Sequence, residues 1–428
     1  MLKASSLFYA IVISLIIALI SSSLILFAYF NKQQFQRYLQ YEKVIRNVDS
    51  GMNLLLGDDE AVPLNTELEV DLFQAGSDMV FLKRRSWGAF EVAVSKATFK
   101  GYTHKRVAQI GSNLFQDKEV ALYLADQNKA LSLCGNTEIK GTAYLPRAGV
   151  KRAYIEGQSF VGNQLIEGEV RESDKTVPDI NMGMIDVNAA YLEGSYNAED
   201  SVVNFAKAQD MDRLHRSFSQ PTVLFFSEGP IDLGGQSYHG NIVFVSSASV
   251  YLSRNSDLKD VLIYAPEVIV EDGFSGTVQA FAGQVMNVGK NCRFEYPSVL
   301  GLINTYPEEG VALHLGEGSE LSGVLFAYQK QSSRKLQLQL TIEKDALIRG
   351  QVYSSATVEL KGAIHGSLAC QRFMLRTPSS VYENHLLNAV IDPSLLSAHF
   401  VGINLLSHSY QAAANDQVQL KQIVQWLE

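Results

Sequence analysis

The segment IRGQVYSSATVELKGAIHGSLAC, residues 348–370, contains two copies of one short pattern. In each copy an apolar residue is followed two positions later by a glycine, Gly350 or Gly366, and after two more positions by a second apolar residue. Side chains two positions apart share one face of a β-strand, so the apolar pair predicts a buried strand face. The glycine is expected either on the other face of the strand or in a bend, where the missing Cβ permits a positive φ.

The same pattern recurs between residues 236 and 370, centred on Gly240, Asp260, Gly276, Gly301, Gly323, Gly350 and Gly366. Successive centres are 20, 16, 25, 22, 27 and 16 residues apart. These lengths suit coils of a parallel β-helix, in which each coil stacks its apolar residues on the coil before. We therefore expect a mainly β chain with a right-handed parallel β-helix over residues 131–376, interrupted by an insertion near residues 172–211. An antiparallel β-sandwich is the alternative, because it also gives short strands at intervals.

Residues 7–30 contain no charged side chain and predict a transmembrane helix. At about 1.5 Å per residue they would span roughly 36 Å, more than the roughly 30 Å hydrocarbon layer. A cleaved signal peptide is the alternative, since Lys3 and the small residues 21–23 fit its outline. The apolar run resumes after those serines and ends in Tyr29 and Phe30, where an interfacial aromatic pair belongs.

We therefore expect residues 1–30 to be a single-pass anchor in the cytoplasmic membrane. The signal-anchor layout places the C-terminal domain outside the cytoplasm, which is the orientation we expect. The positive-inside rule, applied to the basic residues that follow the span, favours the opposite orientation. Those residues are Lys32, Arg37, Lys43 and Arg46.

Apolar residues at helical spacing extend the helix through residues 31–57, with Gly57 as its C-terminal cap. They are Phe35, Tyr38, Leu39, Ile45, Val48, Met52, Leu55 and Leu56. An apolar span that runs into an amphipathic helix and then a β-rich domain resembles type IV pilins and pseudopilins over about the first 60 residues. The resemblance implies a minor component of a pilus-like or secretion apparatus. The glycine and glutamate of pilin N-termini are absent, since no acid precedes Glu42. A juxtamembrane helix that packs on its own domain is the alternative.

Residues 58–130 predict a small β-rich domain. Short apolar or alternating runs at residues 79–82, 89–94 and 107–110 indicate an antiparallel β-meander that precedes the β-helix. Trp87 stands at an expected turn, where it is either a buried lid on the sheet or an exposed contact residue.

Residues 377–428 leave the repeat and predict an irregular cap. Within it, residues 417–427 predict a terminal helix whose apolar face would cover exposed strand edges at the end of the β-helix. A partner-docking helix ending in Trp426 is the alternative.

The steps at residues 348–352 and 364–368 resemble those of bactofilins and other polymer-forming β-helix proteins over about residues 131–376. This resemblance implies a membrane-associated scaffold without catalytic residues, which associates with itself or with protein partners in the cell envelope.

Composition argues against nucleic-acid binding. The net charge is −9 and the pI is near 5.5, and the one basic cluster is residues 83–85. Cys134, Cys292 and Cys370 are too widely spaced for a metal pair or a disulfide framework and are expected to be buried.

We expect no catalytic, cofactor-binding or metal-binding residues. No G-x-S-x-G or H-E-x-x-H motif occurs, and residues 283–290 match a P-loop only loosely. The expected function is a membrane-anchored, non-enzymatic structural or assembly protein, whose β-helix is a rigid scaffold or interaction surface. The alternative is an anchored carbohydrate-binding protein or polysaccharide lyase or hydrolase. Its carboxylates would be Asp257, Asp260, Glu267, Glu271 and Asp272.

Overall fold

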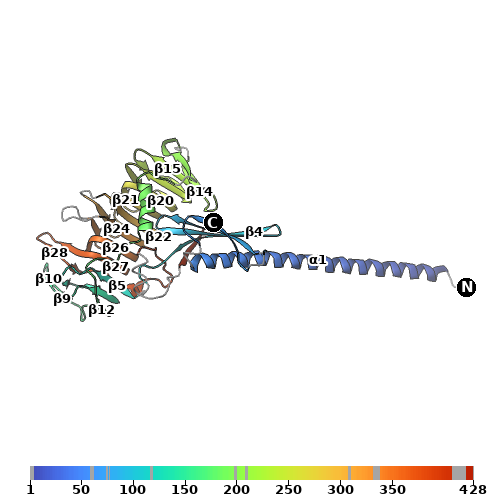
Figure 1. Ribbon diagram of the computed structural model, residues 1–428, viewed down its shortest axis with the longest axis horizontal. Helices are drawn as coiled ribbons and strands as arrows, with labels where there is room; N and C mark the ends of the chain where they lie inside the picture. Colours follow the sequence, from blue (N-terminus) through green and yellow to red (C-terminus); the bar gives the residue numbers. More distant parts are fainter. Residues whose placement is uncertain are drawn as a thin grey trace. The chain divides into compact units, whose positions relative to one another are not determined.

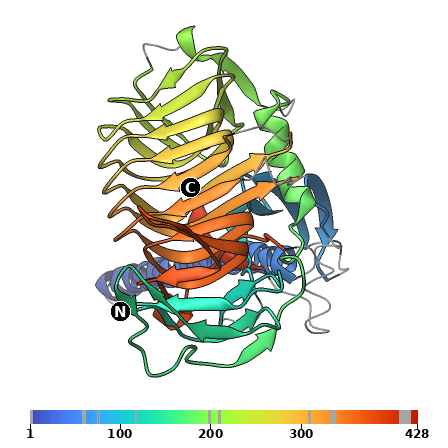
Figure 2. The ribbon, with the colours of Figure 1, turned by 90° about the vertical axis from the view of Figure 1, so that its left-hand side faces the viewer.

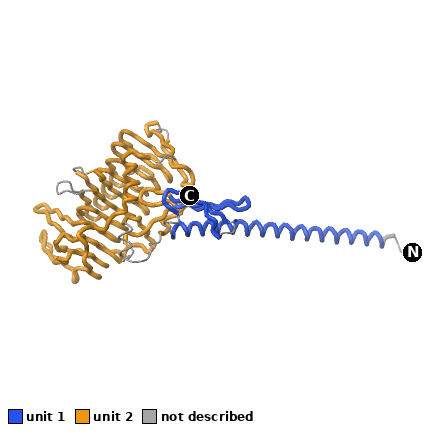
Figure 3. The backbone as a smooth tube through the Cα atoms, in the orientation of Figure 1, with its two compact units in different colours: residues 1–84, 93–106 blue, residues 85–92, 107–428 orange. Residues whose placement is uncertain are grey.

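The computed structural model describes residues 4–57, 62–73, 76, 78–115, 119–196, 200–207, 211–306, 310–330, 338–406 and 421–427. These residues form a mainly β structure with one long apolar helix at the N-terminus (Figure 1). The chain divides into two compact units (Figure 3). Unit 1 comprises Met1–Arg84 and Ala93–Arg106, and unit 2 comprises Arg85–Val92 and Val107–Glu428.

Unit 1 is built around the helix α1 (Ala4–Gly57), which runs without a break through residues 31–57 and ends where the apolar stripe ends. Its last turns are buried through Val44, Val48, Met52 and Leu55. Gly51 allows close packing, since a Cβ there would lie 2.5 Å from Ser95 Oγ.

A five-stranded sheet has the order β1 (Thr66–Asp71), β2 (Met79–Trp87), β3 (Phe90–Phe99), β4 (Tyr102–Gly111) and β31 (Gln422–Leu427). β2, β3 and β4 each contribute residues to both units. β1 pairs antiparallel with β2, and a two-residue turn joins β3 to β4. The β-meander predicted for this part of the chain is therefore present as strands β2 to β4.

The main ladder of unit 2 consists of strands that pair in parallel with the next strand along. It contains β13 (Ser201–Asn204), β15 (Val223–Ser227), β18 (Ile242–Ser246), β20 (Asp257–Val270), β21 (Ser275–Val288), β22 (Arg293–Asn304), β24 (Glu320–Gln329), β26 (Leu347–Leu360) and β27 (Ala363–Arg376). Figure 2 shows these strands as successive layers. Because the neighbours are parallel, the antiparallel sandwich is wrong for residues 236–370.

The long strand β20 bends twice. β20 has register shifts at residues 259–261 and 265–267, so its three legs pair with β17 (Ser237–Gly240), β18 and β19 (Ser249–Leu252). Alternate residues of the middle legs form one buried column that contributes to a continuous core. This column includes Phe244, Ile263, Ala280, Leu300, Leu325, Val352 and Leu368.

The predicted bends are present at five of the seven pattern centres. Gly240, Asp260, Gly323, Gly350 and Gly366 have φ values of 91°, 58°, 150°, 154° and 151°. At the other two centres, Gly276 and Gly301, φ is not positive, so no such bend is present. Gly301 lies on the strand face opposite to the buried column, which is the other placement expected for these glycines.

In the layer of Gly301, Ser298 occupies the position opposite Gly323. Gly301 itself lies in the middle of a strand, between Phe281 and Phe326. A Cβ there would come within 2.6 Å of the Phe326 ring, so this glycine makes room for the aromatic side chains of the neighbouring layers. A glycine with apolar residues two positions before and after it can either form a bend or make room for neighbouring side chains, and the sequence pattern is the same in both cases.

The order of the layers differs from the sequential order that we expected. β5 (Val120–Leu124) pairs with β27, β8 (Thr142–Leu145) pairs with β5, and β12 (Val170–Glu172) pairs with β8. The layers of residues 120–172 therefore follow the last long strand instead of preceding the first. β5 also lies in this ladder, although residues 58–130 were expected to be a separate domain.

Residues 173–196, which we call the strap, follow β12 and lead to β13 at the other end of the ladder. The strap carries α2 (Met182–Leu192), which contacts β20, β21 and β22. The insertion predicted near residues 172–211 therefore runs along the ladder over part of its length.

The predicted terminal helix is wrong for residues 421–427. β31 is a strand that pairs antiparallel with β4, with Ile423 opposite Ile110 and Leu427 opposite Val107. Ile423 and Leu427 are four residues apart, a spacing that fits one face of a helix and one face of a regular strand equally well, so the apolar spacing alone did not distinguish the two. Residues 417–420 lie outside the described part of the chain.

The remaining described elements are short. They are β6 (Leu131–Cys134), β7 (Glu138–Ile139), β9 (Val150–Arg152), β10 (Tyr154–Ile155), β11 (Gln158–Ser159), η1 (Phe205–Lys207), β14 (Arg213–Arg216), β16 (Ile231–Asp232), β23 (Ala312–Leu315), β25 (Gln339–Ile342), β28 (Val381–Glu383), β29 (His385–Leu387), β30 (Val390–Ile391) and η2 (Pro393–Leu395).

Candidate functional site

The N-terminal half of α1 is the largest exposed apolar surface among the described residues. The large apolar side chains that lie exposed between Leu7 and Phe30 have exposed fractions from 49% to 70%. Within the described chain, α1 is the one helix long and apolar enough to cross a membrane. Transfer of such a surface from water to hydrocarbon is favourable by about 25 cal/mol per Å². This segment therefore has the properties of a single membrane span, and a signal sequence would share them.

The apolar residues predicted at helical spacing in residues 31–57 differ in exposure between the first and second half of this segment. Phe35, Tyr38 and Leu39 are 62%, 60% and 47% exposed, whereas Val48 and Met52 are buried. The second half packs within unit 1, where Ser95 Oγ donates a hydrogen bond of 2.8 Å to the carbonyl oxygen of Val48. The first half leaves apolar side chains exposed next to the span.

The five carboxylates proposed for the enzymatic alternative do not share one leg of the ladder. Asp257 lies on the first leg of β20, Asp260 at the following bend, and Glu267 on the third leg. Glu271 and Asp272 lie beyond the end of β20 and accept hydrogen bonds from the backbone N–H groups of Arg254 and Lys290, at 2.9 and 2.7 Å. Carboxylates in such positions stabilise turns.

Asp257 does lie beside a serine and a histidine. Ser237 Oγ donates a 2.7 Å hydrogen bond to Asp257 Oδ2, and His239 Nε2 lies 3.0 Å from the same oxygen. These two groups lower the pKa of Asp257. In a catalytic triad the histidine lies between the serine and the carboxylate. Here the serine bonds directly to the carboxylate, so this arrangement does not activate the hydroxyl as a nucleophile.

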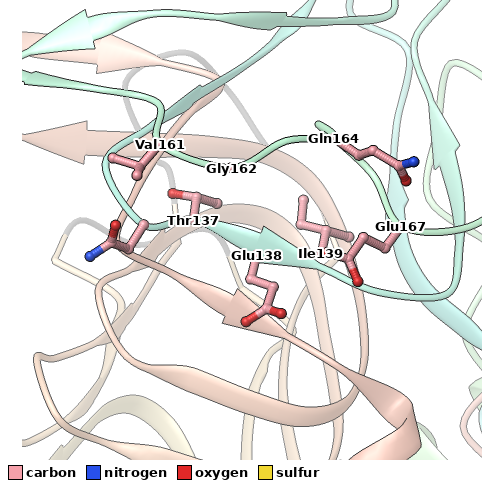
Figure 4. A pocket seen from close by; sticks show the side chains of 8 residues that line it. Thr137, Glu138, Ile139, Val161, Gly162, Gln164 and Glu167 are labelled. Atoms are coloured by element: carbon pink, nitrogen blue, oxygen red, sulfur yellow. The ribbon is translucent and has the colours of Figure 1, made fainter.

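A shallow hollow in the layers after β27 has a volume of about 220 Å³ (Figure 4). It is lined by Asn136, Thr137, Glu138, Ile139, Val161, Gly162, Gln164 and Glu167. In the adjoining hollow, Lys140 pairs with Glu138 and lies 3.7 Å from Asp392 Oδ2. The hydrogen bond that Lys140 donates to Glu138 raises the pKa of Lys140, which keeps the ammonium charged. Lys140 thus offsets part of the negative charge of the carboxylates here.

Neither metal nor thiol chemistry is indicated by the described residues. They contain no group of three or more His, Cys, Asp or Glu side chains that could hold a metal ion. Cys134, Cys292 and Cys370 are buried and unpaired with one another, as expected from their spacing. Burial raises the pKa of each thiol, which disfavours the reactive thiolate. Trp87 is 3% exposed and packs edge-on against Phe218, so the reading of Trp87 as a buried lid is confirmed.

A column of aromatic side chains on the outer side of the ladder is buried beneath the strap, and sequence reasoning missed it. It contains Tyr264, Phe281, Phe326 and Tyr353, which occupy matching positions in their layers. The signal was the aromatic residue one position after the inward apolar residue of these layers, which alternation placed on a face that we assumed to be solvated.

Polar contacts hold the strap to this column. Tyr264 Oη donates to Asn188 Oδ1 at 2.8 Å, and Asn188 Nδ2 donates to the carbonyl oxygen of Gly88 at 3.0 Å. Farther along, Tyr353 Oη donates to the carbonyl oxygen of Pro178 at 3.0 Å. The ring of Tyr191 stacks on Tyr264 with centroids 4.9 Å apart. The strap thus fastens several layers to one another.

Comparison with known proteins gives no family. No family model matches the chain, and no curated protein matches it. Among solved structures, the competence-associated pilin ComZ from Thermus thermophilus aligns with 94% of this chain and 96% of its own. The alignment has 12% sequence identity and a TM-score of 0.22, values that do not establish a shared fold.

Proposed function

We propose that this chain is a membrane-anchored, non-enzymatic structural or assembly protein of the cell envelope. The observation that carries the proposal is the single unbroken helix α1. Its first half exposes an apolar surface of membrane-spanning length, and its second half is buried in the core of unit 1. A helix that is continuous across this point connects a bilayer to a folded unit without a flexible linker.

The ladder of unit 2 supports a scaffold role. We take its layers to be the coils of a right-handed parallel β-helix. Each layer buries its apolar column on the next, and the strap fastens layers that are far apart in the ladder. Such packing gives a rigid body, because moving one layer would expose the apolar side chains of its neighbours.

A minor component of a pilus-like or secretion apparatus is the specific role that we propose. The supporting feature is the order of the elements, an apolar helix that continues into a packed helix and then a β-rich unit. The partners would be envelope proteins or further copies of this chain, and unit 2 would face the extracytoplasmic side. The separation of the five carboxylates removes the reason that the sequence offered for catalysis on glycans.

The anchor is tested by replacing Ile16 and Ile17 with lysine. Each lysine at the centre of a span costs about 2.5 to 3.5 kcal/mol, so the variant should leave the carbonate-washed membrane fraction. The same change at Gln33 and Gln34, just beyond the span, is the matched control and should stay in that fraction. N-terminal sequencing that found cleavage near residues 21–23 would show a signal peptide and refute the anchor.

Orientation and role require two further measurements. Alkaline phosphatase fused after Glu428 should be active, and fluorescence of a fusion that matures only in the cytoplasm would overturn the extracytoplasmic placement. Joint replacement of Asp257, Asp260, Glu267 and Glu271 by their amides should leave envelope assembly unchanged. Loss of binding to, or cleavage of, a glycan in that variant would instead establish the carbohydrate function.

A further inference from the structure

Unit 1 carries basic and aromatic side chains close to the end of the apolar span. We call Lys32, Phe35, Arg37, Tyr38, Phe73 and Lys100 the juxtamembrane patch, and in each of them the side chain is exposed. Residues 31–41 contain two basic and no acidic residues, and residues 93–106 contain four Lys or Arg and no acid. The whole chain has a net charge of −9, so this local excess of positive charge runs against its overall composition.

The acidic groups nearest to the patch already have partners within unit 1. Glu42 pairs with Arg46 at 2.5 Å, Asp49 pairs with Arg106 at 2.5 Å, and Asp78 pairs with Lys43 at 2.9 Å. Asp71 accepts a hydrogen bond of 2.6 Å from the backbone N–H of Gly76. The three ion pairs cancel, and Asp71 keeps one negative charge, so the three basic side chains of the patch leave its charge positive.

The hairpin of β3 and β4, whose turn contains Lys100, lies beside α1 (Figure 3, blue). The ring of Tyr41 lies 6.3 Å from that of Tyr102, and Lys43 Nζ lies 4.7 Å from the centre of the Phe99 ring. The turn of the hairpin is therefore level with about residue 41. Phe73 lines a hollow beside α1 that begins at Leu39.

These levels correspond to the surface of a bilayer. At about 1.5 Å per residue, Phe35 lies roughly 8 Å and Tyr41 roughly 16 Å beyond Phe30. The headgroup layer occupies about 5 to 8 Å on each side of the hydrocarbon, and charges act over a further Debye length of about 8 Å. The helical part of the patch thus lies within or next to the headgroups, and Lys100 lies within electrostatic reach of them.

We propose that the juxtamembrane patch binds anionic lipid headgroups and so holds unit 1 against the membrane surface. The inference rests on the membrane anchorage proposed above. Lysine and arginine side chains attract the phosphate groups of lipids whose headgroups carry a net negative charge. Aromatic side chains favour the interface between headgroups and hydrocarbon. The unbroken helix sets how far the patch lies from the span, and the tilt of that helix determines whether the hairpin also meets the headgroups.

The test uses the full chain reconstituted into vesicles of phosphatidylcholine alone or with 30% phosphatidylglycerol. Thr103 lies next to the hairpin turn, and the three native cysteines are buried, so Thr103→Cys gives one accessible labelling site. Energy transfer from a dye there to an acceptor on the headgroups measures how close the hairpin lies to the surface. We expect stronger transfer in the anionic vesicles and a loss of that difference at 1 M salt.

The charges are tested with the triple variant Lys32→Gln, Arg37→Gln and Lys100→Gln. Each removed charge should lower the ratio of docked to undocked hairpin about fivefold in anionic vesicles. The matched control replaces three exposed lysines of unit 2, Lys151, Lys259 and Lys344, by glutamine and should behave as the unmodified chain.

Two results would overturn the inference: equal transfer in both kinds of vesicle, or a triple variant that behaves as the control. Failure of the full chain to float with the vesicles would instead refute the anchorage, and the inference would fall with it. Flotation is scored before energy transfer, so the two failures are distinguishable.

Discussion

Replacing Gly350 with alanine should destabilise unit 2 strongly, because the new Cβ would collide with the neighbouring layer. Gly350 has a φ of 154°, and a Cβ built there lies 1.8 Å from the carbonyl oxygen of Gly323. Gly366 has the same relation to Gly350, with a Cβ 1.7 Å from its carbonyl oxygen. The obstruction is backbone, so no side-chain rotation relieves it.

The magnitude has two parts. A non-glycine residue in a sparsely populated backbone region costs about 1 to 3 kcal/mol, and overpacking that shifts the backbone costs about 1 to 3 kcal/mol more. We therefore expect a loss of about 2 to 6 kcal/mol in the free energy of unfolding. Trp87 and Trp426 both belong to unit 2, so their fluorescence during denaturant unfolding reports on the right part of the chain.

Two other glycines of unit 2 serve as controls that separate the backbone cost from the overpacking cost. Gly273 has a φ of 78° with open space around its Cβ position, so alanine there should cost only the backbone part, about 1 to 2 kcal/mol. At Gly283 the nearest atom is 3.6 Å away and φ is ordinary, so alanine should be neutral or slightly stabilising. A Gly350→Ala variant as stable as Gly273→Ala would refute the tight stacking of these layers.

Three further substitutions test the packing and the electrostatics. Asn188→Ala should cost about 2 to 4 kcal/mol in denaturant unfolding, because it removes the strap's hydrogen bonds and leaves the hydroxyl of Tyr264 buried without this partner. Burial raises the pKa of Asp260 in the folded state. The free energy of unfolding should therefore increase as the pH falls through this folded-state pKa, and the increase should end near the unfolded-state pKa of about 3.9. Asp260→Asn should therefore raise the unfolding midpoint at pH 7 and abolish this part of the pH profile. Gly51→Ala should cost about 1 to 3 kcal/mol, seen as faster hydrogen exchange in residues 44–55, because its Cβ would meet Ser95.

Each of these has a control or a contrary result. Tyr264→Phe removes one hydrogen bond only and should cost less than Asn188→Ala, and the reverse order would contradict the assignment of the strap contacts. Parallel pH profiles for Asp260→Asn and the unmodified chain would show that Asp260 is not the titrating group. Gly57 has open space at its Cβ position, so Gly57→Ala should leave exchange in residues 44–55 unchanged.

The features of the candidate site could be predicted from the sequence only where they depend on residues that are close together along the chain. The apolar segment 7–30 and its continuation to Gly57 depend on the composition and periodicity of one helix, and the structure shows that helix. The carboxylates failed as a cluster because distance along the chain does not say on which leg of a bent strand a residue lies. Asp257 and Glu267 belong to one strand, yet the register shifts of β20 place them on different legs.

By itself, the sequence determined the membrane-length helix, the short strands with their buried columns, and the bends at glycines such as Gly323 and Gly366. These are properties of neighbouring residues, set by hydrophobic alternation and by the absence of a Cβ. Only the tertiary structure decided that residues 120–172 stack after β27, that the strap covers the aromatic column, and that β31 is a strand. The physical reason is that every layer of a parallel ladder offers the same backbone hydrogen bonds at its edge. The choice of neighbour therefore depends on how distant side chains fit together, which no local pattern records.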